Sequence, residues 1–367
     1  MGNRLTEWVV LTGMLIGLPA LGVVLAGKPI SIYLEFPPES RFIDHAPFSW
    51  TAFVAYAAFI LAVAIPIGFG LWKGFRSTIG SRVDSRPFPW WGWMGLVSGV
   101  VFWVLAWTRM PWFSQLQPHT FFPLWLSYIV VVNALGMRRN GRCLMLDQPW
   151  FFLALFPFSA AFWWFFEYLN RFVQNWYYTG VHYGPGTYFL LATLSFSTVL
   201  PAVLSTQQWI AGSPAVNAGF RSRLPIRPAH PRMLAAITLI TAATGLLLIG
   251  VLPNHLFPLV WVSPLLIWAS VRGLRGKQQV FSNIVRGDWR LVISAAIAAL
   301  LCGWFWEMWN YFSMARWEYS VPLVQRFHVF EMPLLGYAGY LPFGLECLVA
   351  CELIRTGSGI SADHMAP

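Results

Sequence analysis

Residues 50–72 read WTAFVAYAAFILAVAIPIGFGLW, a run without a charged side chain. At about 1.5 Å per residue, a helix of this length crosses the roughly 30 Å hydrocarbon core of a bilayer. Similar runs recur along the whole chain of 367 residues, which is 57% hydrophobic and only 10% charged. The sequence therefore predicts an all-α, polytopic integral membrane protein.

Ten such runs predict about ten transmembrane helices. They lie at about 7–27, 50–72, 92–112, 121–137, 150–168, 187–205, 233–252, 256–271, 291–311 and 334–355. The first run could instead be a cleaved signal peptide. We expect a retained helix, because its apolar stretch is longer than a signal core and Glu7 does not suit the positive segment of an export signal.

Basic residues are distributed unequally between the loops that join these runs. Alternate loops hold eighteen of the twenty-four Lys and Arg residues, and the positive-inside rule assigns such loops to the cytoplasm. We therefore expect both termini in the cytoplasm and a multi-pass protein of the plasma membrane, which is the inner membrane in a bacterium. The net charge of +10 follows from this topology, so we expect no nucleic-acid partner.

Two stretches of the chain match in order and in residue type, about 135 to 140 residues apart. The first is Trp164-Phe165-Phe166-Glu167-Tyr168-Leu169-Asn170, followed by Trp176-Tyr177-Tyr178. The second is Trp304-Phe305-Trp306-Glu307-Met308-Trp309-Asn310, followed by Trp317-Glu318-Tyr319. Phe-Pro-Leu at 122–124 and at 257–259, preceded by His119 and His255, adds a weaker match. The pattern indicates an internal duplication.

The duplication predicts three regions. Residues 1–91 would form an N-terminal two-helix region, residues 92–210 a first four-helix repeat, and residues 228–357 a second. Because four spans is an even number, the two repeats would be parallel and related by an axis along the membrane normal.

Glu167 and Glu307 lie near the outer ends of their predicted helices. Asn170 and Asn310 follow at i+3, so each Glu and Asn share a helix face and could bind one ligand. Two interpretations are open. Each carboxylate could brace an outer loop through hydrogen bonds, or each could be a desolvated acid that relays a proton.

Other candidates lie in the second half of the chain. Glu346 is the most deeply placed ionisable residue, and carboxylates inside a membrane are functional candidates by default. We predict catalytic roles for Glu307, Glu331 and Glu346. The predicted ligand-binding residues are Glu167, Asn170, Trp176, Asn310, Trp317, Tyr319, His119 and His328.

No metal or cofactor is expected. The sequence has no His-x-x-x-His or Glu-x-x-His element, no phosphate-binding glycine-rich loop and no Gly-x-Ser-x-Gly elbow. Its four cysteines show no metal-finger spacing.

The second match continues into Glu331-x-Pro333 and Leu341-Pro342 ahead of Glu346. Residues 304–352 thus resemble the pattern of integral-membrane lycopene cyclases, which also duplicate a small helical unit. That resemblance implies acid-catalysed cyclisation of a carotenoid end group without a redox cofactor. The sequence departs from the family's pattern in lacking a Pro-Glu-Glu element.

Three functions are compatible with these observations. The first is a membrane-embedded protein that binds an apolar lipid or isoprenoid-like molecule in an outer-leaflet aromatic cavity and acts on it through carboxyl acid–base chemistry. The second is a transporter or channel for an ion or small solute. The third is a non-catalytic membrane subunit of a larger complex. The partner would be a membrane lipid or other apolar ligand, and the chain could form a homo-oligomer or join a larger membrane complex.

Overall fold

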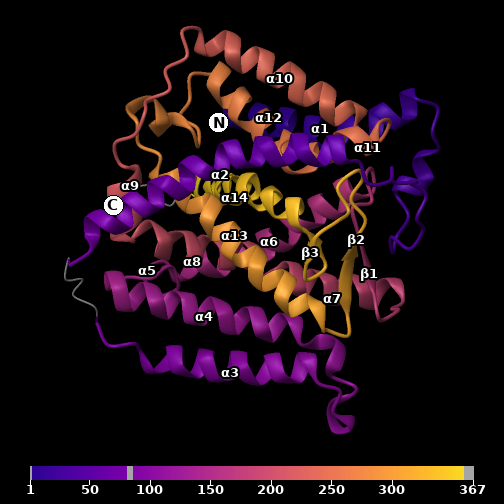
Figure 1. Ribbon diagram of the computed structural model, residues 1–367. Coiled ribbons are helices and arrows are strands. Elements are labelled where there is room, and N and C mark those ends of the chain that lie inside the picture. The colour runs from indigo at the N-terminus through magenta and orange to yellow at the C-terminus, as the bar shows by residue number, and fades with distance from the viewer. Residues whose placement is uncertain (1, 81–85, 359–367) are drawn as a thin grey trace.

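The computed structural model describes residues 2–80 and 86–358, most of which are helical (Figure 1). The longer helices are α1 (Gly2–Leu25), α2 (Trp50–Thr78), α3 (Trp90–Trp107), α4 (Phe121–Asn140), α6 (Pro149–Asn170), α7 (Pro185–Phe196), α8 (Val199–Ala211), α10 (Pro231–Leu248), α12 (Ser263–Leu274), α13 (Arg290–Tyr311) and α14 (Tyr340–Ser358). Shorter helical segments are η1 (Ile30–Tyr33), η2 (Pro111–Phe113), η3 (Gln117–His119), α5 (Leu144–Asp147), α9 (Pro214–Phe220), α11 (Pro253–Leu256), η4 (Phe257–Trp261), η5 (Ser282–Arg286) and η6 (Leu334–Gly339).

Within these described residues, eight helical segments are long and apolar enough to cross a membrane. They are Trp50–Thr78, Trp90–Trp107, Gln117–Asn140, Pro149–Asn170, Pro185–Ala211, Pro231–Leu248, Arg290–Tyr311 and Leu334–Arg355. Each coincides with one of the ten predicted runs. The predicted helical, multi-pass architecture is confirmed at this level.

The other two predicted runs are helical in a different way. The run at 7–27 contains a shorter apolar helix, Val9–Leu25. The run at 256–271 is broken, because Pro253–Trp261 and Ser263–Leu274 meet at an angle of 57°. A bend of this kind belongs to a broken span or to a re-entrant loop.

Four central helices, α6, α8, α13 and α14, pack against one another and hold much of the buried core. Helices α3 and α10 lie at opposite edges of the bundle, where α3 packs on α4 and α10 packs on α12 (Figure 1).

Helix α2 contacts the rest of the bundle near its two ends. Near its C-terminal end, a Cβ added to Gly74 would come 2.0 Å from the Ala215 carbonyl oxygen, so glycine permits close packing on α9. At its N-terminal end, Ser49 N–H donates to the Leu323 carbonyl at 2.9 Å. The Phe53 and Phe327 rings lie 5.4 Å apart beside that bond. The middle of α2 faces the cavity described below.

Two short antiparallel strand pairs, which the sequence analysis did not predict, lie beyond the ends of α6 and α13. Strand β1 (Trp176–Thr179) pairs with β2 (Arg316–Tyr319), and β3 (His328–Val329) pairs with β4 (Met332–Pro333). The β1–β2 register places Trp176 opposite Tyr319, and Tyr178 opposite Trp317. The matching Trp-x-Tyr segments of the sequence are thus paired with each other.

The loops that carry most of the basic residues meet at the opposite end of the bundle from these strands. Hydrogen bonds cross-link them: Arg86 N–H to the Arg138 carbonyl, Arg139 Nη1 to the Trp209 carbonyl, Arg223 N–H to the Gly287 carbonyl, and Arg355 Nη2 to Gln148 Oε1. Glu7 of α1 adds ion pairs with Lys277 and Arg275 at this end.

Candidate functional site

Glu167 and Asn170 hold strand β1 against the end of α6. Glu167 is buried, and its Oε1 accepts three hydrogen bonds. The donors are Trp163 Nε1 at 2.9 Å, Trp176 Nε1 at 3.0 Å and the Tyr178 hydroxyl at 2.6 Å. Asn170 Nδ2 donates to the Trp176 carbonyl at 2.8 Å, and its Oδ1 accepts from Asn175 N–H at 2.8 Å. The two residues thus have different partners: Asn170 bonds the backbone of β1 and the residue before it, and Glu167 bonds side chains.

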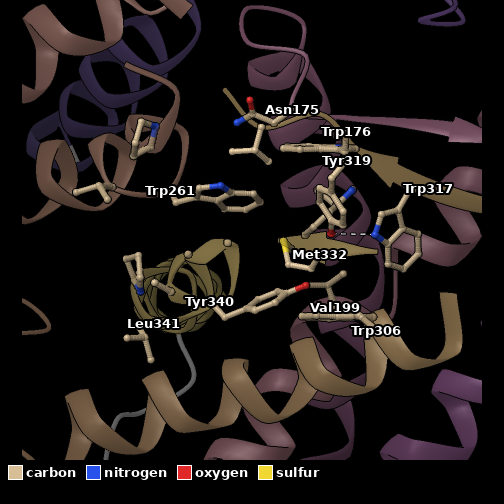
Figure 2. Close-up of a pocket in the computed structure, with 18 of the residues that line it drawn as sticks. Asn175, Trp176, Val199, Trp261, Trp306, Trp317, Tyr319, Met332, Tyr340 and Leu341 are labelled. Carbon is tan, nitrogen blue, oxygen red and sulfur yellow. Dashed lines mark hydrogen bonds between the residues drawn. The ribbon is translucent and has the colours of Figure 1, made fainter. Parts of the chain in front are cut away.

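Glu307 and Asn310 repeat this arrangement at the end of α13. Glu307 is 0% exposed, and its Oε1 accepts from the hydroxyls of Tyr319 and Tyr340, each at 2.7 Å. Trp317 Nε1 donates to the Tyr319 hydroxyl at 2.8 Å, as the dashed line in Figure 2 marks. Asn310 binds the N–H and carbonyl of Trp317 at 2.8 and 2.7 Å.

The two carboxyl clusters differ in their donors: Trp176 bonds Glu167 directly, whereas Trp317 donates to the Tyr319 hydroxyl. In the first, Trp163 reaches Glu167 from four residues earlier on the same helix. The position four residues before Glu307 is Gly303, and the ring of Tyr340 from α14 occupies the space above it. Glu307 therefore has two phenol donors, and its Oε2 has no hydrogen-bond partner among the described residues.

The phenols of the two strands stay protonated. Burial, followed by the neighbouring carboxylate, raises the pKa of the Tyr178 and Tyr319 hydroxyls well above their usual range. Each hydroxyl therefore donates to its carboxylate, and its lone pairs are left for other donors.

A cavity of about 1300 Å³ lies between α2 and the central helices. Its walls are mainly apolar and rich in aromatic residues, and Figure 2 shows several of these rings around the Tyr340 and Tyr319 hydroxyls. Wall residues near the two clusters are Trp163, Trp176, Tyr178, Trp261, Trp306, Trp317, Tyr319 and Tyr340. The opposite wall comes from α2, at Tyr56, Phe59, Ile60, Ala62, Val63, Pro66, Ile67 and Phe69. The wall thus includes the rings that bind Glu167 and Glu307, and each carboxylate lies behind them.

The cavity is elongated along the helices. Its wall includes Trp289 before α13 and Trp306 near the end of that helix, a span of about 25 Å at 1.5 Å per residue. At the strand end the wall contains Glu39, Arg41, His182 and Arg316. At the other end it contains Phe220, Arg223 and Phe281. The shape fits a long molecule better than a compact one.

Among the described residues, the other predicted site residues make no hydrogen bond with the Glu307 side chain. Glu346 is six residues beyond Tyr340 on α14, and its Oε1 accepts from Leu265 N–H at 3.3 Å, at the start of α12. Glu331 is in the turn between β3 and β4. His328 is exposed, and Gln325 Nε2 lies 3.2 Å from its Nε2.

His119 is exposed at the strand end of the cavity wall, where its ring stacks with Tyr183 at 6.4 Å. The structure thus brings Glu307, Asn310, Trp317 and Tyr319 into one cluster and Glu167, Asn170 and Trp176 into another. It connects neither cluster to Glu331, Glu346 or His328 by a direct hydrogen bond among the described residues.

Several participants were missed in the sequence. Tyr178 belongs to the repeated Trp-x-Tyr segment and could have been included. Tyr340 precedes Leu341-Pro342, which matches Leu200-Pro201 after Val199, so its counterpart gives no sign of a phenol. Apart from the Tyr56 phenol, the α2 wall carries only apolar residues and gives no signal distinct from a lipid-facing helix.

Within residues 2–80 and 86–358, no group of three or more His, Cys, Asp or Glu side chains could hold a metal ion. A scan of protein-family models, a search of curated proteins and a search of solved structures each found no match.

Proposed function

We propose that this protein binds an elongated apolar molecule, a lipid or an isoprenoid-like chain, in the aromatic cavity between α2 and the central helices. The observation that carries the proposal is the cavity of about 1300 Å³ whose wall includes the Tyr319 and Tyr340 phenols. Large apolar pockets with a few convergent polar groups are typical of ligand sites.

The chemistry that we propose is proton transfer through the phenols. Glu307 does not line the cavity, but its Oε1 bonds both hydroxyls at 2.7 Å. A protonated Glu307 would pass its proton to a phenol oxygen as that phenol gives its own proton to the ligand. An ionised Glu307 would take the phenol's proton as the phenol oxygen accepts one from the ligand. The resemblance to integral-membrane lycopene cyclases, in which a carboxylic acid drives cyclisation, agrees with such a role for Glu307.

We further propose ten membrane crossings, two parallel four-helix repeats and both termini in the cytoplasm. The β1–β2 register supports the repeats, because it maps onto itself when Trp176 and Tyr178 are exchanged with Trp317 and Tyr319. Cysteines placed at the exposed positions Arg138 and His182 test the orientation: the first should react only from the cytoplasm and the second only from outside.

A second candidate function is transport of an amphiphile. The cavity wall reaches from Arg223 at one end to Arg41 and Arg316 at the other, which suits a path across the membrane. We rank it second because the polar groups of the middle section are tied to Glu167 and Glu307 rather than arranged along a polar path.

Extraction of the purified protein and mass spectrometry of the bound molecules test the binding proposal. Ala62→Trp fills the cavity from α2, whereas Ala64→Trp adds the same ring to an exposed position of α2 outside the cavity wall. The wild type and Ala64→Trp should retain an apolar molecule in stoichiometric amounts, and Ala62→Trp should lose it. Equal amounts in both variants, or none in the wild type, would contradict the proposal and favour a non-catalytic subunit.

A further inference from the structure

Arg223 lies where the cavity meets the basic end of the bundle. It follows α9, and its N–H donates to the Gly287 carbonyl at 2.9 Å, just before α13 begins. The wall around it is formed by Phe220, Leu224 and Trp289. A cation thus lies at the end of an aromatic chamber.

Only some of the hydrogen-bond donors of the Arg223 guanidinium have a partner in the protein. Its Nε donates to the Gly219 carbonyl, while its Nη2 is buried and has no hydrogen-bond partner among the described residues. A Cβ added to Gly70 of α2 would lie 3.1 Å from this Nη2, so the group is held between α2 and α9. Part of its donor capacity is therefore unsatisfied.

Arg223 also lacks a carboxylate partner within the described part of the chain. Two other partly buried arginines have one: Arg171 pairs with Glu35 at 3.0 Å, and Arg290 pairs with Asp288 at 2.9 Å, while Arg139 donates to the Trp209 carbonyl instead. A charge removed from water usually requires a counter-charge. The phenyl ring of Phe220, 5.6 Å from the guanidinium carbon, compensates only weakly.

We propose that the ligand is an amphiphile with an anionic head group, and that Arg223 binds this group while the apolar chain extends along α2 toward Tyr340. The inference rests on the proposed function and deepens it, because it gives the ligand a head group and a direction. Carboxylate and phosphate oxygens share the required chemistry, since both accept the paired N–H donors of a guanidinium.

Two probes with the same chain isolate the head group. Dibrominated stearic acid and dibrominated stearyl alcohol both quench tryptophan, and Trp289, Trp261 and Trp306 line the cavity. Binding is measured in detergent micelles, at a pH that ionises the acid, as quenching against the mole fraction of the probe. We expect the wild type to bind the acid about tenfold more tightly than the alcohol.

Arg223→Gln should remove that preference and leave alcohol binding unchanged. The matched control is Arg41→Gln, which removes a cation from the other end of the same cavity and should keep the preference. If Arg223→Gln does not fold, the exposed cavity residue Leu224 gives a second test. Leu224→Glu, which places a carboxylate beside Arg223, should abolish the preference, and Leu224→Gln should retain it.

Several results would overturn the inference. The first is equal affinity of the wild type for the acid and the alcohol, and the second is loss of the preference for the acid in Arg41→Gln. The third is equal weakening of acid and alcohol binding in Arg223→Gln. The fourth is displacement of the acid by inorganic phosphate, which would assign Arg223 to a free anion. If neither probe gives saturable quenching of the tryptophan fluorescence, the cavity does not bind an apolar chain, and the proposed function itself is refuted.

Discussion

Tyr340 lies directly over Gly303: a Cβ added to Gly303 would come 2.4 Å from the Tyr340 ring. The absence of a side chain on α13 thus makes room for a phenol from α14, which reaches Glu307 at 2.7 Å. At the matching place in the first cluster, Trp163 occupies that space and makes the bond itself. The two clusters donate to their carboxylates by different routes, and only the second offers a phenol from another helix.

Gly303→Ala should move Tyr340 away from Glu307. The added methyl group has no space, so we expect a loss of about 1–3 kcal/mol in the free energy of unfolding, as for other overpacked sites. Thermal unfolding in detergent measures it. Gly68→Ala in α2 is the control, because a Cβ there meets nothing within 4 Å. Equal stability of the two variants would show that Tyr340 does not depend on Gly303.

Asn170 and Asn310 should be energetically coupled through the strands that they hold. Each binds the backbone of its own strand, and β1 and β2 pair with each other. Replacing either by Ala leaves buried backbone groups unpaired and should cost about 1–3 kcal/mol. The double variant should lose measurably less than the sum, because the first change already loosens the shared sheet. Strict additivity in a double-mutant cycle would show that the strand pair does not couple the two Asn residues energetically.

Glu307→Gln should change which molecule is retained, whereas Glu167→Gln should act mainly on stability. Only Glu307 is linked to Tyr340, the phenol shown in Figure 2 near Met332 and Trp306. Chromatography and mass spectrometry of the extracted molecules detect unreacted ligand, even when the reaction conserves mass. An identical set of molecules from the wild type and both variants would leave Glu307 as a structural brace.

The loop before α2 should weaken in acid. His45 Nε2 donates to the Val173 carbonyl at 2.8 Å, and in the neutral ring its Nδ1 accepts from the Ser320 hydroxyl at 2.6 Å. Burial lowers the pKa of His45 from its ordinary 6.5; the hydrogen bond to the Val173 carbonyl opposes this effect, Arg41 reinforces it and Asp44 opposes it. Because the unfolded chain binds the proton more readily, stability is full above about 6.5 and falls as the pH drops below it.

Hydrogen exchange of this loop between pH 7 and pH 5 measures the effect. His45→Gln should flatten the pH dependence, and a change at the exposed His182 should not. A pH profile that is the same in His45→Gln and the wild type would assign the acid sensitivity to another group.

The sequence contained the helices and the position of both carboxyl clusters. Apolar runs predicted the long segments, and Glu-x-x-Asn followed by Trp-x-Tyr predicted that Glu and Asn share a face near a helix end. The roles assigned to Glu331, Glu346, His119 and His328 stay predictions.

Other features could not be predicted, because they depend on contacts between distant residues. The β1–β2 pairing joins Trp176 to Tyr319. Both segments are rich in strand-favouring Trp and Tyr, but no local pattern shows that they pair with each other. Tyr340 reaches Glu307 from another helix through a gap at Gly303. The cavity wall formed by α2 could not be predicted from the sequence for another reason. Side chains that face lipid and side chains that face an apolar cavity have the same composition.

An experimental structure of the protein purified in lipid nanodiscs tests the central claim most directly. We predict continuous, elongated density along the middle of α2, ending within hydrogen-bonding distance of the Tyr319 or Tyr340 hydroxyl. A chamber collapsed by movement of α2 onto α13, or filled only by water, would contradict it.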